Sequence, residues 1–492
     1  MIFFLRTLAL VGCSYSAYAN PGKLDTKVHG SFMFLLTLLI SVDNTKMHKH
    51  FEKAKYLQKH RTGYSSTCNI VEWRRWAQAR FQGLIDQQPS VAVRTIQHAF
   101  WGRPLCELSR RNVAVALRTL FTTYEVYERI DTFEADVKEI ETMLSPLHPF
   151  SEKPTAHNFI RPNNDVTTPG LCTPIYYPLV VTIPRTMFRL AANAFISHVQ
   201  GFTRRVDGKT MMVYWSRISD IQKPTVVFMH GIGLGVIPYL HMLSKMCQVA
   251  GAPNVILVEF PGISGHSVRE EAELGFPPYP SAEEVAKSIR EHLSVTVAPH
   301  SRVIGIAHSF GTMVLSNIMN TFPDTFSRTA YIDPVCFFEG ATTLWPVLYS
   351  PLTITTFFES LREVDPVKFI THLAAGDIYT QHVIKNVMYF AEYANRGNDM
   401  KPLLVLSGKD HLVDTRAVRD CAKEDSEIWF YENWIHGDFL FHPSFQRRLG
   451  VWLGEAMKEV LFEDGEYDGG NLMKQSKSCP VLEGLHRNKP RR

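Results

Sequence analysis

The sequence predicts an α/β fold built on a doubly wound, mostly parallel β-sheet. In the C-terminal half of the chain, short apolar runs alternate with helix-length segments, and turn residues or helical stretches follow each run. Hydrophobic residues make up 45% of the chain and charged residues 20%, the balance of a globular protein. Repeated β-α units of this kind form a parallel sheet covered by helices. Buried strands are expected at residues 226–229, 255–260, 303–307, 329–332, 403–406 and 428–431.

The rest of the 492 residues is expected to form attachments to this sheet, because one ordinary domain accounts for only about 250 residues. Amphipathic periodicity predicts helices over 71–85 and 113–143, and a strand pair over 201–216 is expected to open the sheet domain. The expected division is an apolar segment over 1–42, a helical N-terminal region over 43–144, a proline-rich linker over 145–198, the sheet domain over 199–465 with an aromatic-rich helical cap insertion at about 335–400, and a basic tail over 466–492.

The N-terminal segment leaves the localisation open. Residues 2–12 are mostly apolar, and Ala17-Tyr18-Ala19 offers a cleavage pattern, which fits a signal peptide, although Arg6 interrupts the apolar run. A second apolar run, 32–42, is shorter than the roughly 20 residues that a spanning helix needs. The alternatives are a membrane-associated or secretory chain, with contact to a membrane surface, and a cytoplasmic one.

Charge and cysteine content also limit which cofactors and partners can be expected. A formal net charge of +4 is too small on this length to indicate nucleic acid. The eight cysteines are scattered, without a C-x-x-C pair or a histidine spacing typical of zinc. We therefore expect no metal, no organic cofactor and no nucleic-acid partner, and nothing in the sequence predicts a specific protein partner.

A serine stands at a strand-to-helix turn. The run 302–312 contains an apolar strand that ends in Ala307-His308-Ser309-Phe310-Gly311. In a nucleophile elbow the serine occupies a strained backbone position, and small residues two positions before and after it let strand and helix approach. Ala307 replaces the usual glycine but is small enough for that approach. The pattern predicts Ser309 as a nucleophile, with Gly311 supporting the turn.

A glycine-containing loop follows the first parallel strand. The run 226–235 leads from apolar residues into His230-Gly231-Ile232-Gly233, a loop that can expose backbone amides. Acyl transfer needs such N–H donors, because they stabilise the oxyanion of the tetrahedral intermediate. We expect the amides of Ile232 and Phe310 to be the donors, with His230, Gly231 and Gly233 as the supporting loop. A phosphate-binding loop is not completed here, since no Lys-Ser/Thr follows.

An acid and a base follow the last two strands. Asp410 closes the run Ser407-Gly-Lys-Asp after one strand, and His436 follows the next. With Ser309 they lie just past the carboxyl ends of strands, where open α/β sheets place their sites. His436 would act as general base, and Asp410 would orient and stabilise its charged form. Asp414, in the same loop as Asp410, and Asp333, which ends the strand after the serine helix, remain alternative acids.

Residues from about 200 to 460 resemble the α/β-hydrolase superfamily. The resemblance is carried by His230-Gly231, Glu259 to His266, Ala307 to Gly311, Ser407 to Asp410 and His436. It implies a serine hydrolase of esterase or lipase type, with Asp410 as the acid and the insertion at about 335–400 as a cap over the site. An apolar cap suits a small hydrophobic ester or lipid substrate. The alternatives are an acyltransferase that uses the same acyl-enzyme and a non-catalytic binding protein with this fold.

Overall fold

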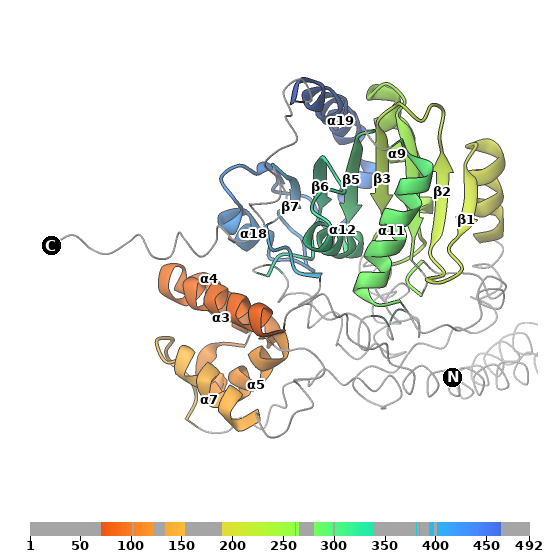
Figure 1. Ribbon diagram of the computed structural model, residues 1–492. Helices are drawn as coiled ribbons and strands as arrows, with labels where there is room; N and C mark the ends of the chain where they lie inside the picture. The colour runs from red at the N-terminus through yellow and green to blue at the C-terminus, as the bar shows by residue number, and fades with distance from the viewer. Residues whose placement is uncertain are drawn as a thin grey trace, which may run out of the picture.

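The computed structural model describes residues 70–100, 103–121, 133–152, 189–260, 262–264, 280–298, 301–338, 340, 380, 383, 393–397 and 401–463. Its centre is an eight-stranded sheet in the order β1-β2-β4-β3-β5-β6-β7-β8 (Figure 1). The first two strands pair antiparallel at one edge, and the neighbours from β4 to β8 run parallel. This arrangement confirms the predicted fold class. The strands are β1 (Thr203–Val206), β2 (Val213–Arg217), β3 (Thr225–Met229), β4 (Asn254–Glu259), β5 (Val303–His308), β6 (Arg328–Ile332), β7 (Leu403–Ser407) and β8 (Glu427–Tyr431).

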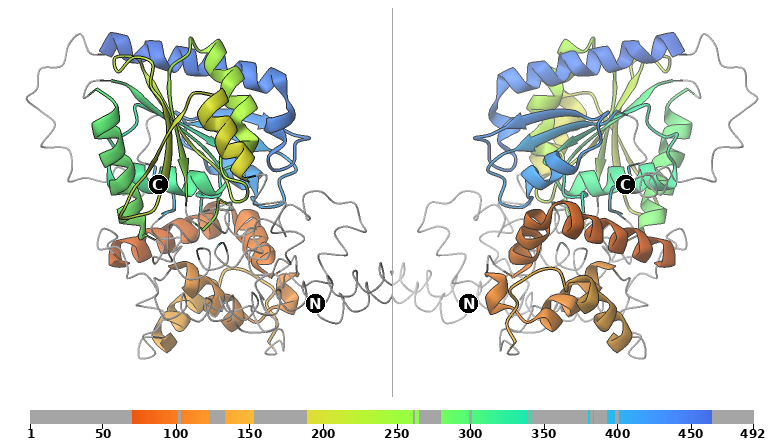
Figure 2. Two further views of the ribbon diagram at one scale, coloured as in Figure 1. Left: turned by 90° about the vertical axis from the view of Figure 1, so that its right-hand side faces the viewer. Right: turned by 90° about the vertical axis from the view of Figure 1, so that its left-hand side faces the viewer.

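Helices cover both faces of the sheet, which explains why its central strands are continuous apolar runs. Every residue of β3, β4 and β7 is buried. Alternate side chains of β3 enter opposite cores: Val227 joins the core under α11 (Ala282–Thr296) and α12 (Phe310–Thr321), and Phe228 joins the core under α9 (Leu240–Val249) and α19 (Pro443–Glu463). Figure 2 shows the two helical layers on either side of the sheet.

Local signals fix several helix ends. Ser281 and Glu284 form a capping box at the start of α11, so that each side chain accepts from the other residue's backbone N–H. Asp414 caps α18 (Thr415–Cys421) by accepting from the Ala417 N–H. Two short 3-10 turns, η3 (Ile237–Tyr239) and η6 (Asp438–Phe441), lie in the loops after β3 and β8.

The N-terminal helices have a core of their own. They are α3 (Ile70–Gln87), α4 (Pro89–Ala99), η1 (Leu105–Glu107), α5 (Arg110–Phe121) and α7 (Phe133–Met143). The Nε atom of Arg118, buried on α5, lies 3.0 Å from Oδ2 of Asp136 on α7. In one straight helix these residues would stand about 27 Å apart. The single helix expected over 113–143 is therefore wrong, because periodicity gives the buried face of a segment but not the point where the chain turns back.

These helices pack at the end of the sheet where the parallel strands finish (Figures 1 and 2). The rings of Trp76 and Phe81 meet Phe338, six residues beyond the end of β6, edge-on at 6.1 and 6.2 Å. Nε of Arg94 lies 3.5 Å from a carboxylate oxygen of Asp414, the cap of α18. The N-terminal helices are thus joined to the sheet domain beside the loops that the sequence marks as catalytic.

Several predicted regions fall outside the described residues. These are the apolar segment 1–42, most of the linker 145–198, most of the insertion 335–400, and the tail 466–492. Within the linker, residues 189–194 are helical and continue into a π-helical turn, η2 (Phe195–Val199), whose Ile196 enters the sheet core. Among the described helices, none combines the length and the apolar character needed to cross a membrane.

Candidate active site

Ser309 occupies a strained turn between β5 and α12. Its backbone lies at φ 50° and ψ −122°, a region that non-glycine residues rarely adopt. A Cβ atom on Gly311 would stand 2.3 Å from the carbonyl oxygen of Met229, so the first turn of α12 packs on β3 only because residue 311 is glycine. Ala307 is fully buried and pairs with Met229 and Tyr331 on the neighbouring strands. These small residues let the serine stand at the strand end.

Three side chains meet at this turn. Nε2 of His436 lies 2.9 Å from Oγ of Ser309, and its Nδ1 lies 2.7 Å from Oδ2 of Asp410. The other carboxylate oxygen of Asp410 accepts from the backbone N–H groups of Leu412 and Val413, at 2.7 and 3.2 Å. A carboxylate held in this way accepts from Nδ1–H, which leaves Nε2 as the acceptor for the serine hydroxyl proton.

The loops that carry Asp410 and His436 are fastened to each other. The Lys409 N–H donates to the carbonyl of Trp434 at 2.8 Å, and the Trp434 ring stacks on Tyr431 at 3.8 Å between centroids. A Cβ atom on Gly408 would stand 2.6 Å from backbone atoms of Glu432, so the acid loop turns this tightly only with glycine there. The distance between acid and base is therefore set by backbone contacts.

The charges around His436 favour the protonated form of its ring. Burial alone would lower the pKa of His436, but the charge of Asp410, its hydrogen bond to the ring and the charge of Asp333 outweigh burial and raise that pKa above 6.5. A base that gains a proton from Ser309 is then stabilised as the imidazolium.

The alternative acids contact other groups. Asp414 caps α18 and lies beside Arg94. Asp333 is fully buried, and its oxygens accept from the backbone N–H groups of Ser407 at 3.2 Å and Gly437 at 2.8 Å. Of the three predicted carboxylates, all within the described residues, Asp410 is the one that hydrogen-bonds the ring of His436. His442, six residues after His436, stacks on Trp434.

The expected oxyanion donors lie on the loop after β3 and at the start of α12. In the described part of the chain, the amide N–H groups of Ile232 and Phe310 have no hydrogen-bond acceptor. Their neighbours are held: the Gly233 N–H donates to the carbonyl of Ile263 at 3.0 Å, and a Cβ on Gly231 would stand 3.0 Å from that of Ser309. This loop and Ser309 are thus packed against each other.

His230, the first residue of this loop, is wholly buried. Its Nε2 lies 2.9 Å from Oγ of Ser264, and that hydroxyl in turn donates to the carbonyl of Phe260. The ring of His230 therefore joins the loop after β3 to the loop after β4. The assignment of His230 to the supporting loop stays a prediction, with which this contact is compatible.

A buried ion pair holds the far end of the same loop. Glu259 accepts from the Val236 N–H at 3.1 Å and from the Arg189 guanidinium, which also donates to the carbonyl of Leu234 at 3.3 Å. A Cβ atom on Gly235 would stand 2.2 Å from Oε1 of Glu259. Sequence reasoning missed Arg189, because a lone arginine beyond a proline-rich stretch gives no local signal; the only hint was a glutamate ending an apolar strand.

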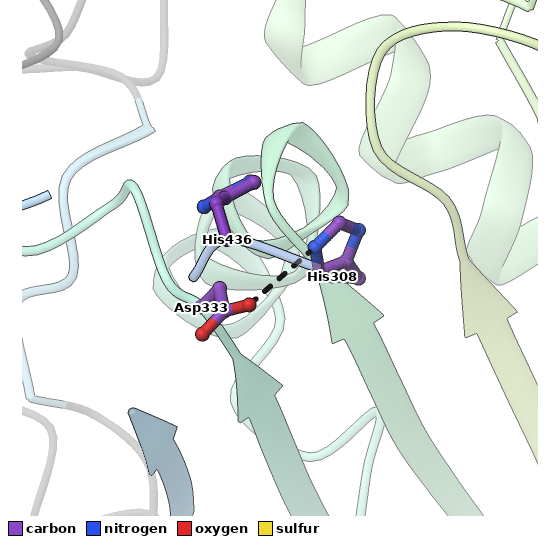
Figure 3. Close-up of side chains that lie close together, drawn as sticks. All are labelled: His308, Asp333 and His436. Atoms are coloured by element: carbon purple, nitrogen blue, oxygen red, sulfur yellow. Dashed lines mark ion pairs between the residues drawn. The ribbon is translucent and has the colours of Figure 1, made fainter. Parts of the chain in front are cut away.

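A second cluster lies beside the first. Figure 3 shows His308 at the end of β5 and Asp333 at the end of β6, with His436 next to them; Nε2 of His308 lies 3.9 Å from Oδ2 of Asp333. One nitrogen or oxygen from each of the three residues could face a metal ion. The donor set fits an ion poorly, because both ring nitrogens of His436 and Oδ2 of Asp333 already have hydrogen-bond partners.

A comparison with known protein families agrees with the fold. Residues 226–463 match the model of the alpha/beta hydrolase family. The segment 226–463, a little under half of the chain, is thus similar to the alpha/beta hydrolase family. This confirms the resemblance seen in the sequence and agrees with the predicted enzyme class, a hydrolase. A search of the curated proteins found no match.

Solved structures of esterases and of a phospholipase resemble about half of the chain. The carboxylesterase CesB of Bacillus subtilis is 10% identical with a TM-score of 0.42, over 55% of this chain and 98% of its own. A membrane phospholipase A, described as a bacterial virulence factor, is 13% identical with a TM-score of 0.42, over 57% and 94%. A hyperthermophilic esterase from Pyrobaculum calidifontis is 15% identical with a TM-score of 0.37, over 59% and 94%. At these values the likenesses indicate neither substrate nor activity.

Proposed function

We propose that this chain is a serine hydrolase that cleaves a carboxylic ester through an acyl-enzyme on Ser309, within a catalytic domain over residues 199–465. The observation that carries the proposal is the unbroken hydrogen-bond chain from Ser309 through His436 to Asp410. A neutral serine is a poor nucleophile unless an oriented base takes its proton. Two further observations support Ser309 as the nucleophile: its backbone is strained, and it lies within the segment that matches the alpha/beta hydrolase family.

In the first half of the reaction, Oγ of Ser309 attacks the ester carbonyl carbon while Nε2 of His436 takes the hydroxyl proton. The carbonyl oxygen becomes an oxyanion, which accepts from the Ile232 and Phe310 amides; one such donor contributes on the order of 3 kcal/mol. Collapse of the intermediate breaks the bond to the alkoxy group, which leaves as an alcohol with the proton from His436. Water then attacks the acyl-enzyme by the same steps and releases the acid.

A hydrophobic acyl group is the substrate we favour. Two large apolar side chains on the loops that follow β3 and β8 are exposed: Leu234, at 42%, and Phe441, at 80%. Exposed apolar groups on the loops that carry the proposed oxyanion donor and base suit an apolar substrate. The aromatic-rich cap predicted at 335–400 would add to this surface.

A fluorophosphonate probe tests the proposal, because it phosphonylates only an activated serine. The wild type and Ser316→Ala, which removes a buried serine from the interior of α12, are expected to take up one probe per chain. Ser309→Ala is expected to take up none and to lose ester hydrolysis by about 10⁵- to 10⁶-fold. Failure of the folded wild type to label, or equal labelling of Ser309→Ala, would refute the hydrolase. Product analysis with an added alcohol separates hydrolysis from acyl transfer.

A further inference from the structure

We propose that Tyr239, His308 and Asp333 form a second polar chain beneath the triad, which holds the four catalytic loops in their relative positions. All three are assigned as positioning residues, not as residues that touch substrate. This inference rests on the proposed function, since it concerns how the same site is kept in order. It is carried by hydrogen bonds that end on the backbone of loops far apart in the sequence.

Tyr239 forms the first link. Its hydroxyl lies 3.1 Å from the backbone nitrogen of Gly231, from which it accepts, and 2.8 Å from Nδ1 of His308. The hydroxyl has one hydrogen and two lone pairs, and we assign that hydrogen to Nδ1 of His308, because the ring's own hydrogen then lies on Nε2, toward the carboxylate of Asp333. Tyr239 is buried on η3. The peptide next to the expected Ile232 donor is therefore fixed by a side chain that also orients His308.

His308 forms the second link, directly before Ser309 in the chain. Because its Nδ1 accepts, the neutral ring carries its hydrogen on Nε2. That nitrogen is buried, hydrogen-bonds no described residue and faces Oδ2 of Asp333 at 3.9 Å. The distance is beyond a hydrogen bond but within reach of an attraction between an N–H dipole and a carboxylate. Burial lowers the pKa of His308 well below 6.5, so the ring stays neutral.

Asp333 forms the third link and reaches the two remaining loops. Its oxygens accept from the N–H of Ser407, which ends β7, and from the N–H of Gly437, which follows His436. The backbone of Asp333 has φ 44°, so the residues that directly follow the neighbouring strands β5 and β6, Ser309 and Asp333, both have positive φ. Strained residues persist where the surroundings hold them, and they concentrate at functional sites.

The chain therefore contacts the backbone of every catalytic loop: the oxyanion loop at Gly231, the elbow at His308, the acid strand at Ser407 and the histidine loop at Gly437. Displacing one end would move the donors and the base relative to Ser309. Misplacement by about 1 Å can cost about a hundredfold in rate. The loss should appear in kcat, because these contacts set the arrangement of the reacting groups and do not bind substrate.

Tyr239→Phe is the first test, with Tyr214→Phe as the matched control. Both tyrosines are buried and hydrogen-bonded, but the hydroxyl of Tyr214 contacts Ser288, on α11. Tyr239→Phe is expected to lower kcat by about ten- to a hundredfold with KM within about twofold. Tyr214→Phe should keep kcat within about twofold. Fluorophosphonate titration counts the competent sites, so loss of folded protein is separated from loss of rate.

Asp333→Asn is also expected to change the pH dependence of activity, which a loss of packing alone would leave unchanged. The titratable groups that face His436 are Asp410, Asp333, His308 and His411. Removing the Asp333 charge lowers the pKa of His436, so the acidic limb of kcat/KM should shift to lower pH, whereas Tyr239→Phe should leave the limb in place. His308→Asn, which keeps an acceptor near the Nδ1 position, should retain more kcat than His308→Leu.

Two results would overturn the second polar chain. One is Tyr239→Phe matching Tyr214→Phe in kcat, and the other is Asp333→Asn leaving the acidic limb unmoved. In either case the wild type would still label at Ser309, so this failure is distinct from failure of the hydrolase itself.

Discussion

The loops after β6 and β7 each place a fully buried carboxylate beside the same histidine, yet they contact it differently. Oδ2 of Asp410 lies 2.7 Å from the Nδ1 ring nitrogen of His436. Asp333 instead accepts from the backbone N–H of Gly437, one residue further on. Both side chains are 0% exposed, so burial does not distinguish them. The atom that each carboxylate reaches decides whether it acts on the ring or on the loop that carries it.

The charges of Asp410 and Asp333 also differ in their effect on the pKa of His436. Burial raises the pKa of Asp333, while the charge of His436 and the N–H groups of Gly437 and Ser407 act in the opposite direction. For His436, the charge of and hydrogen bond to Asp410 contribute more to raising the pKa than Asp333 does. We infer that the loop after β7 sets the pKa of the proposed base, His436, and that the loop after β6 sets its position.

Among substitutions of the carboxylates, the largest expected effect is that of Asp410→Asn. An amide at this position can present an N–H to the ring and favour the wrong tautomer, so that His436 no longer accepts the Ser309 proton. We expect kcat for ester hydrolysis to fall by about 10³- to 10⁴-fold with KM little changed. Steady-state kinetics corrected for folded protein would measure this. A loss below tenfold would mean that another carboxylate serves the base.

The pH dependence gives an effect of intermediate size. A base must be neutral to take a proton, so activity rises with pH as His436 loses its own. Because Asp410 raises the pKa of His436 above 6.5, the acidic limb of kcat/KM in the wild type should lie above pH 6.5. In Asp410→Asn the stabilising charge is gone, and the limb should move to lower pH. An unchanged limb in the variant would contradict the electrostatic role of Asp410.

The smallest effect is expected at Asp414, four residues further along the loop after β7. Asp414→Ala removes the cap of α18, which costs about 0.5 to 2 kcal/mol of unfolding free energy. The ion pair with Arg94, whose side chain is 43% exposed, contributes little to the free energy of unfolding. Denaturant unfolding should show that loss while kcat stays within about twofold. A fall of a hundredfold or more in kcat would restore Asp414 as the acid.

Much of the sheet domain could be predicted because its information is local. Strands buried on both faces appear as unbroken apolar runs, and the expected strand 226–229 differs from β3 (Thr225–Met229) by one residue. Ser309, Asp410 and His436 stand at strand ends, where short motifs mark them. The sequence could not predict the links from Tyr239 to His308 or from Arg189 to Glu259, because the partners lie about 70 residues apart and neither Tyr239 nor Arg189 belongs to a motif.

The division of labour between the two loops is tested most directly by the second-order rate of fluorophosphonate labelling at Ser309, compared in the wild type, Asp410→Asn and Asp333→Asn at one pH. We predict the largest decrease in Asp410→Asn, by about 10³-fold or more, and a decrease of at most about a hundredfold in Asp333→Asn. The reverse order, with Asp333→Asn as the slower variant, would show that Asp333 is the carboxylate that serves His436.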